Sequence, residues 1–140
     1  MSDIREKIVA YKLIQDRLEV LVSERNKLVS RIAEIKDFLG GIDSLEKGDI
    51  IFNLAEGIFR RGKSEKEKFL VDVGAGVLVE KDVGECKEFL KERLRIMEGV
   101  LSEIDKEIVK LSSALEKLGK EIEKGVSGAG SVKKETEKHS

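Results

Sequence analysis

The stretch that decides the fold is FLVDVGAGVLVEK, which occupies Phe69 to Lys81. Two short runs of apolar, largely β-branched residues lie on either side of a Gly-Ala-Gly sequence. Glycine reaches the positive φ angles that tight turns need, and the flanking residues favour extended backbone. The stretch therefore predicts a β-hairpin, although the sequence on both sides of it is helical in character.

A second predicted hairpin precedes the first. Its strands are DIIFNL (49–54) and GIFRR (57–61), separated by a short loop that contains glycine. A charged link, GKSEKEK (62–68), leads into KFLVDV (68–73), and GVLVEK (76–81) closes the second hairpin. Strand alternation places Phe69, Val71 and Val73 on one face of the third strand.

The first half of the chain has the heptad periodicity of a coiled coil, with steps of three and four residues. The stripe consists of Ile4, Lys7, Tyr11, Ile14, Leu18, Leu21, Arg25, Leu28, Ile32, Ile35, Leu39 and Ile42. Ten of these twelve positions are apolar, which predicts a helix over 3–39. Gly40-Gly41 provides a stop, because glycine readily adopts the left-handed conformation after a helix end.

The second half repeats the pattern without interruption. Its stripe consists of Leu90, Leu94, Met97, Leu101, Ile104, Ile108, Leu111, Leu115, Leu118 and Ile122. Asp82 and Glu85 have the spacing of a capping box, so a helix over 84–124 is expected. Residues 125–140 have the Gly/Ser and charged composition of a disordered tail.

Two helices of this length, each about 55–60 Å long, pair most simply as an antiparallel coiled coil within one chain. The predicted fold class is α+β, with both hairpins at one end of the coiled coil and a single domain over 1–124. Lys7 and Arg25 interrupt the apolar stripe. Either both side chains extend their charges into solvent, or Arg25 pairs with a carboxylate and sets the helix register.

Composition excludes several classes of function. Charged residues make up 39% of the chain and aromatic residues 4%, and the formal net charge is -1. A nucleic-acid-binding protein usually carries a basic excess, so no nucleic-acid partner is expected. The N-terminal MSDIREK lacks an apolar signal core, and no run approaches 18 apolar residues, so neither a signal peptide nor a membrane span is expected.

No group of residues predicts catalysis, a metal or a cofactor. Gly74-Ala75-Gly76 lacks the third glycine and the following helix of a dinucleotide-binding turn. Cys86 is the one cysteine and His139 the one histidine, so neither has the partners that metal binding or nucleophilic catalysis needs. A single cysteine also fits a reducing compartment.

The hairpins point to assembly. Isolated two-stranded hairpins are marginal in water, and their unpaired edges are normally covered or paired. We therefore expect them to join equivalent strands of other subunits. The residues predicted to mediate subunit assembly are Ile51, Phe52, Ile58, Phe59, Phe69, Val71, Val73, Val77 and Val79.

The segment VDVGAGVLVEKDVGECKEFLKERL (71–94) resembles the prefoldin α-subunit family, whose last hairpin has a similar sequence and runs into the second helix. The order of helix, two hairpins and helix extends the resemblance over 3–124. Two hairpins rather than one match an α-type subunit. The chain departs from the pattern in lacking proline, and GDIIFNLAEGIFRRG matches only loosely.

The resemblance implies an ATP-independent co-chaperone. Its members form a hexamer of two α-type and four β-type subunits, in which the hairpins build a β-barrel. The coiled-coil tips hold non-native proteins and deliver them to a group II chaperonin. An archaeal or eukaryotic cytoplasm is the implied location, and no cofactor is implied.

Client contacts at the tips require apolar side chains that the helix seam does not use. Val9 and Leu13 lie off the stripe, Ile8 at its margin, and Val109 off the stripe in the second helix. The residues predicted to bind clients are Ile4, Ile8, Val9, Leu13, Leu115, Leu118 and Ile122. The alternative function is a structural scaffold or filament subunit that assembles through the hairpins and holds no clients.

Overall fold

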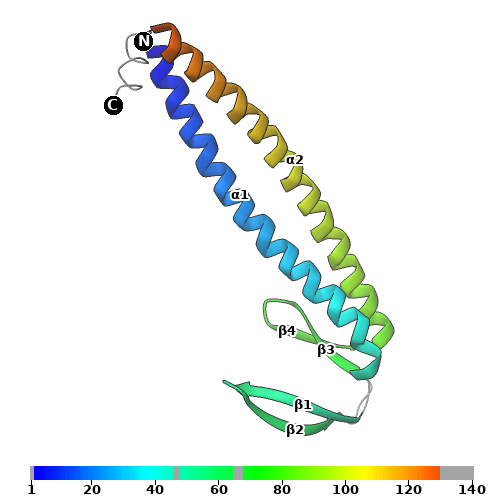
Figure 1. Ribbon diagram of the computed structural model, residues 1–140. Coiled ribbons are helices and arrows are strands. Elements are labelled where there is room, and N and C mark those ends of the chain that lie inside the picture. The colour runs from blue at the N-terminus through cyan, green and yellow to red at the C-terminus, as the bar shows by residue number, and fades with distance from the viewer. Residues whose placement is uncertain (1, 46–47, 65–67, 130–140) are drawn as a thin grey trace. The chain divides into compact units, whose positions relative to one another are not determined.

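A computed structural model of the chain describes residues 2–45, 48–64 and 68–129. The elements follow the predicted order of helix, two hairpins and helix, which confirms the α+β fold class. They are α1 (Ser2–Gly41), the short 3-10 helix η1 (Ile42–Leu45), β1 (Gly48–Ala55), β2 (Ile58–Ser64), β3 (Lys68–Gly74), β4 (Val77–Asp82) and α2 (Val83–Ala129) (Figure 1).

The chain divides into two units, each of which contains part of both helices. Unit 1 comprises residues 1–28 and 100–140, and unit 2 comprises residues 29–99. In unit 1, α1 and α2 run side by side in opposite directions, because Lys7 pairs with Glu121 whereas Arg25 pairs with Asp105. In unit 2, Lys36 pairs with Glu98 and Asp43 with Lys87, again with antiparallel order.

The helix seam is confirmed position by position. All twelve predicted positions of α1 and all ten of α2 are buried or half-buried, whereas most positions between them are exposed. The most deeply buried side chains are Leu21 in unit 1 and Ile42 in unit 2, with exposed fractions of 1% and 0%. Each helix thus buries one narrow stripe, as expected for a coiled coil rather than a globular core.

The two charged positions of the seam both have partners on α2. Arg25 Nε donates a hydrogen bond to Asp105 Oδ1, and Lys7 Nζ lies 3.7 Å from Glu121 Oε2. Of the two alternatives for Arg25, the structure therefore shows the pair with a carboxylate. Both side chains of this pair remain partly exposed, so the charges also keep contact with water.

Helix α1 ends at Gly41, as the predicted stop at Gly40-Gly41 requires, but the expected left-handed conformation is wrong, because neither glycine has a positive φ. Both lie within α1, and the described glycines with positive φ are Gly48, Gly57, Gly74 and Gly76, all in the hairpins. The chain stays helical through η1, which brings Ile42 into the next seam position with its side chain fully buried. Ser44 Oγ donates to the carbonyl oxygen of Gly41 at 2.7 Å and satisfies one of the acceptors at the end of α1.

The end of α2 also differs from the expected boundary. The helix continues to Ala129, five residues past the predicted end at 124, and residues 130–140 of the expected tail lie outside the described residues. Gly125 occupies the seam position after Ile122, and a side-chain carbon added there would lie 3.0 Å from Ile4 Cδ1. Glycine therefore fits this close approach, and contact with α1 favours continuation of the helix.

The start of α2 confirms the predicted capping box. The backbone N–H of Glu85 donates to Asp82 Oδ1 at 2.7 Å, and the N–H of Asp82 donates to Glu85 Oε1 at 3.2 Å. Two N–H groups without helical partners are thereby satisfied, so strand β4 can lead directly into the helix.

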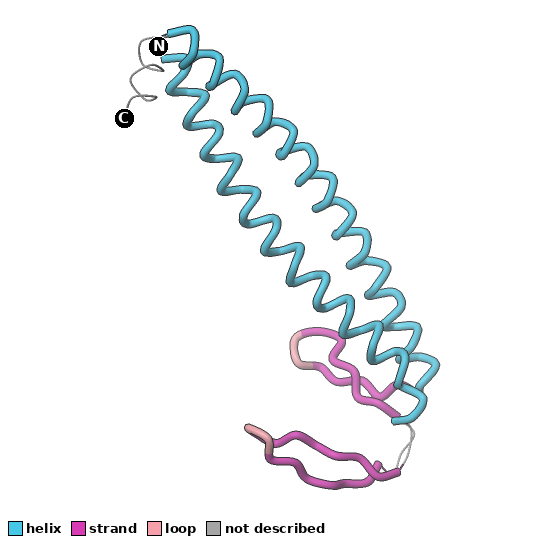
Figure 2. The backbone as a smooth tube through the Cα atoms, viewed as in Figure 1, coloured by secondary structure: helices cyan, strands magenta, loops and turns pink. Residues whose placement is uncertain are grey.

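The hairpins form two separate two-stranded sheets within the described residues (Figure 2). In the first, β1 and β2 pair antiparallel with Ile51 opposite Arg61. In the second, β3 and β4 pair antiparallel with Val71 opposite Val79. Strand β2 extends to Ser64 and so includes the start of the predicted link, while residues 65–67 lie outside the described part.

Candidate functional site

Both hairpins close with a two-residue turn in which the two central residues have positive φ. These residues are Glu56 (φ 30°) and Gly57 (φ 81°) in the first hairpin, and Ala75 (φ 52°) and Gly76 (φ 76°) in the second. This is the pattern of a type I′ turn, whose twist matches that of the flanking strands. The Gly-Ala-Gly sequence is therefore a hairpin turn and not the start of a nucleotide-binding helix.

A β-bulge stands beside each turn. The register shifts between Asn53 and Ala55 in β1 and between Asp72 and Gly74 in β3. The Asp72 carboxylate accepts a hydrogen bond from the backbone N–H of Gly74 at 2.9 Å, which stabilises the second bulge. Val73 lies in this bulge, so the ladder does not place it on the face of Phe69 and Val71 as strand alternation predicts.

The β3–β4 hairpin has two different faces. Phe69 and Val71 are half-buried and share a face with Val79 and Lys81, so this face is the more apolar of the two. Leu70 and Leu78 lie on the opposite face together with Asp72 and Glu80. Leu70 is 66% exposed and Leu78 58%, so this face also presents apolar surface to solvent.

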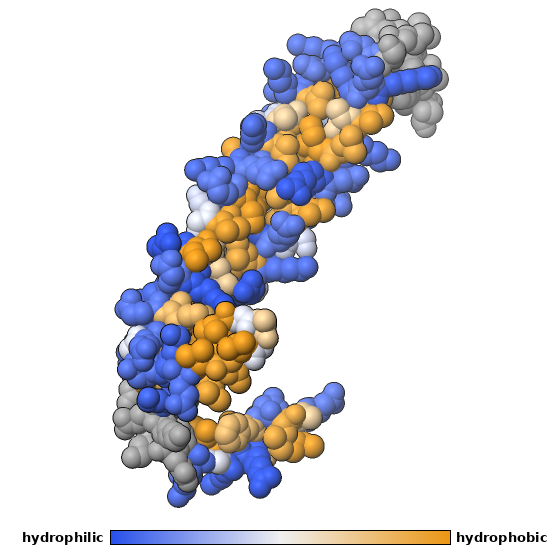
Figure 3. All heavy atoms as spheres, turned by 180° about the vertical axis from the view of Figure 1, so that it is seen from behind, coloured by the Kyte–Doolittle hydropathy of each residue, from blue (hydrophilic) through white to orange (hydrophobic). Residues whose placement is uncertain are grey.

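The β1–β2 hairpin carries apolar side chains on both faces, alternating with charged and polar ones. Phe52 lies on the same face as Gly62, and its ring occupies the space that a side chain at position 62 would need. Ile51 and Phe59 lie on the opposite face, and both are exposed. Figure 3 shows apolar atoms at the surface of both hairpins.

Most of the residues predicted to mediate assembly are solvent-exposed in the single chain. Phe69 and Val71 are half-buried, and the exposed ones are Ile51, Phe52, Ile58, Phe59, Val73, Val77 and Val79. Sequence reasoning missed Leu54, Leu70 and Leu78, which are equally exposed. Apolar residues on both faces of a strand are the signal that could have identified the last two, because they indicate a sheet covered on both sides.

The residues predicted to bind clients fall into two groups in unit 1. Val9 and Leu13 are 58% and 63% exposed, and Ile8 is also exposed. Ile4, Leu115, Leu118 and Ile122 are half-buried in the helix seam, so little of each is available to a ligand. The structure thus separates free apolar side chains on α1 from side chains that hold the two helices together.

Further exposed apolar residues lie in unit 1. Val20 and Val22 are exposed on α1, and Val109 and Val126 on α2. Sequence reasoning noted Val109 but missed Val126, because it placed that residue in a disordered tail. The continuation of α2 past Gly125 gives Val126 a helical position one residue from the contact with Ile4.

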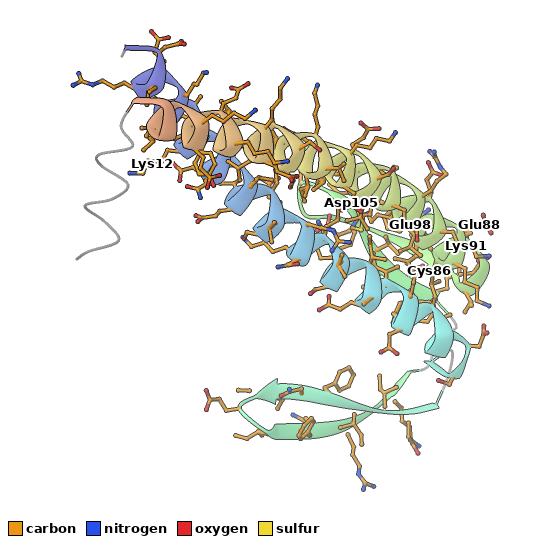
Figure 4. The ribbon with its side chains drawn as sticks, turned by 45° about the horizontal axis from the view of Figure 1, so that its top comes forward. Lys12, Cys86, Glu88, Lys91, Glu98 and Asp105 are labelled. Carbon is orange, nitrogen blue, oxygen red and sulfur yellow. The ribbon has the colours of Figure 1, made fainter. Side chains whose placement is uncertain are left out.

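Cys86 is buried near the start of α2 and has no features of a reactive thiol (Figure 4). Burial raises the pKa of its thiol, and the positive charge of Lys81 opposes this shift only in part. Within the described residues, no group of three or more histidine, cysteine or acidic side chains is arranged to hold a metal ion. No helix in the described part is long and apolar enough to cross a membrane.

Comparison with protein families identifies one match. Residues 12–126 match the family described as prefoldin subunit. The chain is 31% identical over 102 residues to a prefoldin subunit alpha of Archaeoglobus fulgidus, which covers 69% of this chain and 74% of that protein. It is 34% identical over 99 residues to a prefoldin subunit alpha of Thermofilum pendens, which covers 66% of this chain and 77% of that protein.

A solved structure shares the fold. The chain superposes with a TM-score of 0.67 on a chain from the cryo-EM structure of filamentous PFD from Methanocaldococcus jannaschii. The match covers 84% of this chain and 98% of that chain, at 22% sequence identity. The arrangement of two long helices and two hairpins is therefore that of a known protein fold.

Proposed function

The chain belongs to the prefoldin subunit family, and on that premise we propose that it is an α-type subunit of an ATP-independent co-chaperone. In this proposal its hairpins join those of β-type subunits in a hexamer of two α and four β chains. The assembly binds non-native proteins and transfers them to a group II chaperonin in the cytoplasm of an archaeal cell. No cofactor or catalytic residue takes part.

The exposed apolar residues of α1 support the client-binding part of this proposal. Val9 and Leu13 lie one helical turn apart, outside the seam, and both are more than half exposed. Non-native chains expose scattered apolar groups, so a useful holding surface must be apolar and tolerant of sequence. Side chains that the seam does not use can supply such contacts without separating the helices.

A client-protection assay tests this role. The variant carrying Val9→Ser and Leu13→Ser should lose suppression of aggregation when a chemically unfolded client is followed by light scattering. Removal of residues 1–10 should have the same effect. Ile96→Ser is a matched control, because Ile96 is 54% exposed on α2 but belongs to unit 2. Full protection by the double variant would mean that the client is held elsewhere.

The hairpins support the assembly part of the proposal. Val71 is half-buried opposite Val79, on the more apolar face of its sheet. Val71→Asp places a charge where a neighbouring subunit is expected to cover it, and an unpaired buried charge is costly. Sedimentation should show loss of assembly, while circular dichroism shows retained helix. Val73→Asp tests whether the bulged residue, which lies off that face, is also covered. Ser102→Asp, which adds a charge at an exposed position of α2 outside the hairpins, is the control.

A second candidate function is a scaffold or filament subunit without client-holding activity. This chain shares its fold with a chain of a filamentous PFD structure, and that likeness is the reason to test the filament role. Both functions use the hairpins, so hairpin variants do not separate them. The Val9 and Leu13 variant does, because it should leave filaments intact. An intact assembly that gives no client protection with its β-type partners present would favour the scaffold.

A further inference from the structure

The outer edge of β3 has a self-complementary sequence. Within the described residues β3 pairs only with β4, so its other edge has backbone N–H and C=O groups with no strand partner. Along this edge the residues are Lys68, Phe69, Leu70, Val71 and Asp72, which is a basic residue, three apolar residues and an acidic residue. Read in the opposite direction, the pattern of apolar positions is the same and the end charges are reversed.

Antiparallel pairing of two such strands has one register in which all partners match. With Leu70 opposite Leu70 of the second copy, Lys68 lies opposite Asp72, and Phe69 lies opposite Val71. Opposite charges and apolar pairs at directly opposed positions both stabilise a sheet. A shift by two residues in either direction places Leu70 opposite Lys68 or Asp72, so the alternatives are disfavoured.

Strands β1 and β2 are less suited to this contact. The middle of β2 has Arg60 and Arg61, so self-pairing there opposes like charges, and charges on an edge generally discourage pairing. Antiparallel pairing of β1 with β3 along these residues places Asp49 opposite Asp72. Strand β1 could pair with itself, but its end residues, Asp49 and Asn53, are not oppositely charged.

We propose that β3 pairs antiparallel with β3 of a second copy of this chain, with Leu70 at the two-fold axis. The two hairpins then form one four-stranded sheet, in the order β4, β3, β3, β4. Phe69, Val71 and Val79 of both copies share one face of that sheet with Lys81 at its outer strands, and four strands exceed the three that an independently stable sheet needs. This inference rests on the proposed assembly through the hairpins, and it brings the exposed Leu70 side chains of the two copies next to each other.

Cysteine cross-linking tests the position of the two-fold axis. The native thiol is first removed with Cys86→Ala, and Leu70→Cys or Leu78→Cys is added. Directly opposed residues in an antiparallel pair have Cα atoms about 4.5–5.5 Å apart, within the range of a disulfide. Mild oxidation should therefore give covalent dimers of the Leu70→Cys chain. Leu78 is the matched control, because it is exposed on the same face but belongs to β4.

Charge reversal tests the ends of the register. Lys68→Asp places an aspartate opposite Asp72 of the second copy, and Asp72→Lys places a lysine opposite Lys68 of the second copy, so each variant opposes like charges. Each should weaken self-association measured by sedimentation by about tenfold or more, equivalent to about 1.4 kcal/mol. The double variant restores opposite charges and should associate more tightly than either single variant. Asp72→Lys also removes the hydrogen bond to Gly74, and Lys68→Asp also faces Asp82 within its own hairpin. The double variant keeps both of these costs, so tighter association of the double variant is the decisive comparison.

The outcomes separate this inference from the proposed function. Cross-linking at Leu78 equal to that at Leu70, or a double variant weaker than both single variants, would overturn the β3 pairing. If the chain assembles only with β-type subunits, the same cross-linking is done in that assembly. Absence of the Leu70 dimer there would refute the pairing and leave the proposed function intact. A chain that remains monomeric under both conditions would overturn the pairing and the proposed assembly together.

Discussion

Arg25 Nε of α1 lies 2.5 Å from Asp105 Oδ1 of α2, so a charged residue at a seam position is held by a partner on the facing helix. An unpaired arginine in a narrow apolar seam would lose solvation and gain nothing in return. The pair is partly open to water, which limits both that loss and the strength of the attraction. Its main physical effect is to favour one alignment of α1 against α2 in unit 1.

Asp105→Asn should lower the free energy of unfolding by about 0.5–1 kcal/mol, because it removes the charge but keeps the shape of the side chain. Arg25→Leu should instead raise it by about 1 kcal/mol, since leucine completes the apolar stripe. Denaturation followed by circular dichroism at fixed protein concentration measures both. Glu103→Gln is the control, because Glu103 pairs with Lys106 within the same helix at the exposed surface. An Asp105→Asn chain as stable as the original would show that the pair contributes nothing.

Two glycines of α2 should respond differently to alanine. A side-chain carbon at Gly99 meets no atom within 4 Å, so Gly99→Ala should stabilise the chain by about 0.5–1 kcal/mol through helix propensity. A carbon at Gly125 would lie 3.0 Å and 3.3 Å from two atoms of Ile4. Gly125→Ala should therefore stabilise the chain less than Gly99→Ala does, or not at all. Thermal denaturation of the two variants tests this difference. Equal stabilisation would mean that Ile4 moves aside without cost.

The turn of the β3–β4 hairpin contains a strained residue. Ala75 has φ 52°, a conformation that costs an ordinary L-residue about 1–2 kcal/mol and that asparagine tolerates better. Ala75→Asn should therefore raise the melting temperature, while Ala75→Val should lower it because a β-branched side chain resists this conformation. Calorimetry at one protein concentration measures both changes. If the two variants shifted in the same direction, backbone strain would not be the cause.

The buried thiol makes stability depend on pH in the alkaline range. Burial raises the pKa of Cys86, so the folded chain holds this proton more tightly than the unfolded chain does. The resulting stabilisation is fully present below the ordinary thiol pKa of about 8.5 and is lost as pH rises through the raised value. Urea denaturation at pH 8 and pH 10 should show this loss for the original chain.

The matched control for this pH dependence is Cys86→Ala, which should lack the thiol contribution while other groups titrate as before. The difference between the two chains isolates the effect of the thiol. A thiol-specific reagent should also react slowly with the folded chain at pH 8 and rapidly in urea. Rapid modification of the folded chain would show that the thiol is accessible and that its proton is not held by burial.

Local sequence determined the order of elements and the interior of the helix pair. Steps of three and four residues place every predicted seam position, from Ile4 to Ile42 and from Leu90 to Ile122, in a buried or half-buried site. The hairpins and the start of α2 were equally predictable. Turn glycines and the Asp82–Glu85 capping box act through neighbours a few residues away, so their effect does not depend on the rest of the fold.

Only the tertiary structure decided the features that depend on residues far apart in the sequence. Gly125 continues α2 because it lies against Ile4, and Gly41 remains helical because the chain goes on to bury Ile42. The partner of Arg25 is eighty positions away, so no local pattern could identify it. Leu70 was missed for a related reason. Strand alternation shows which face a residue shares, but whether that face is covered depends on what packs against it.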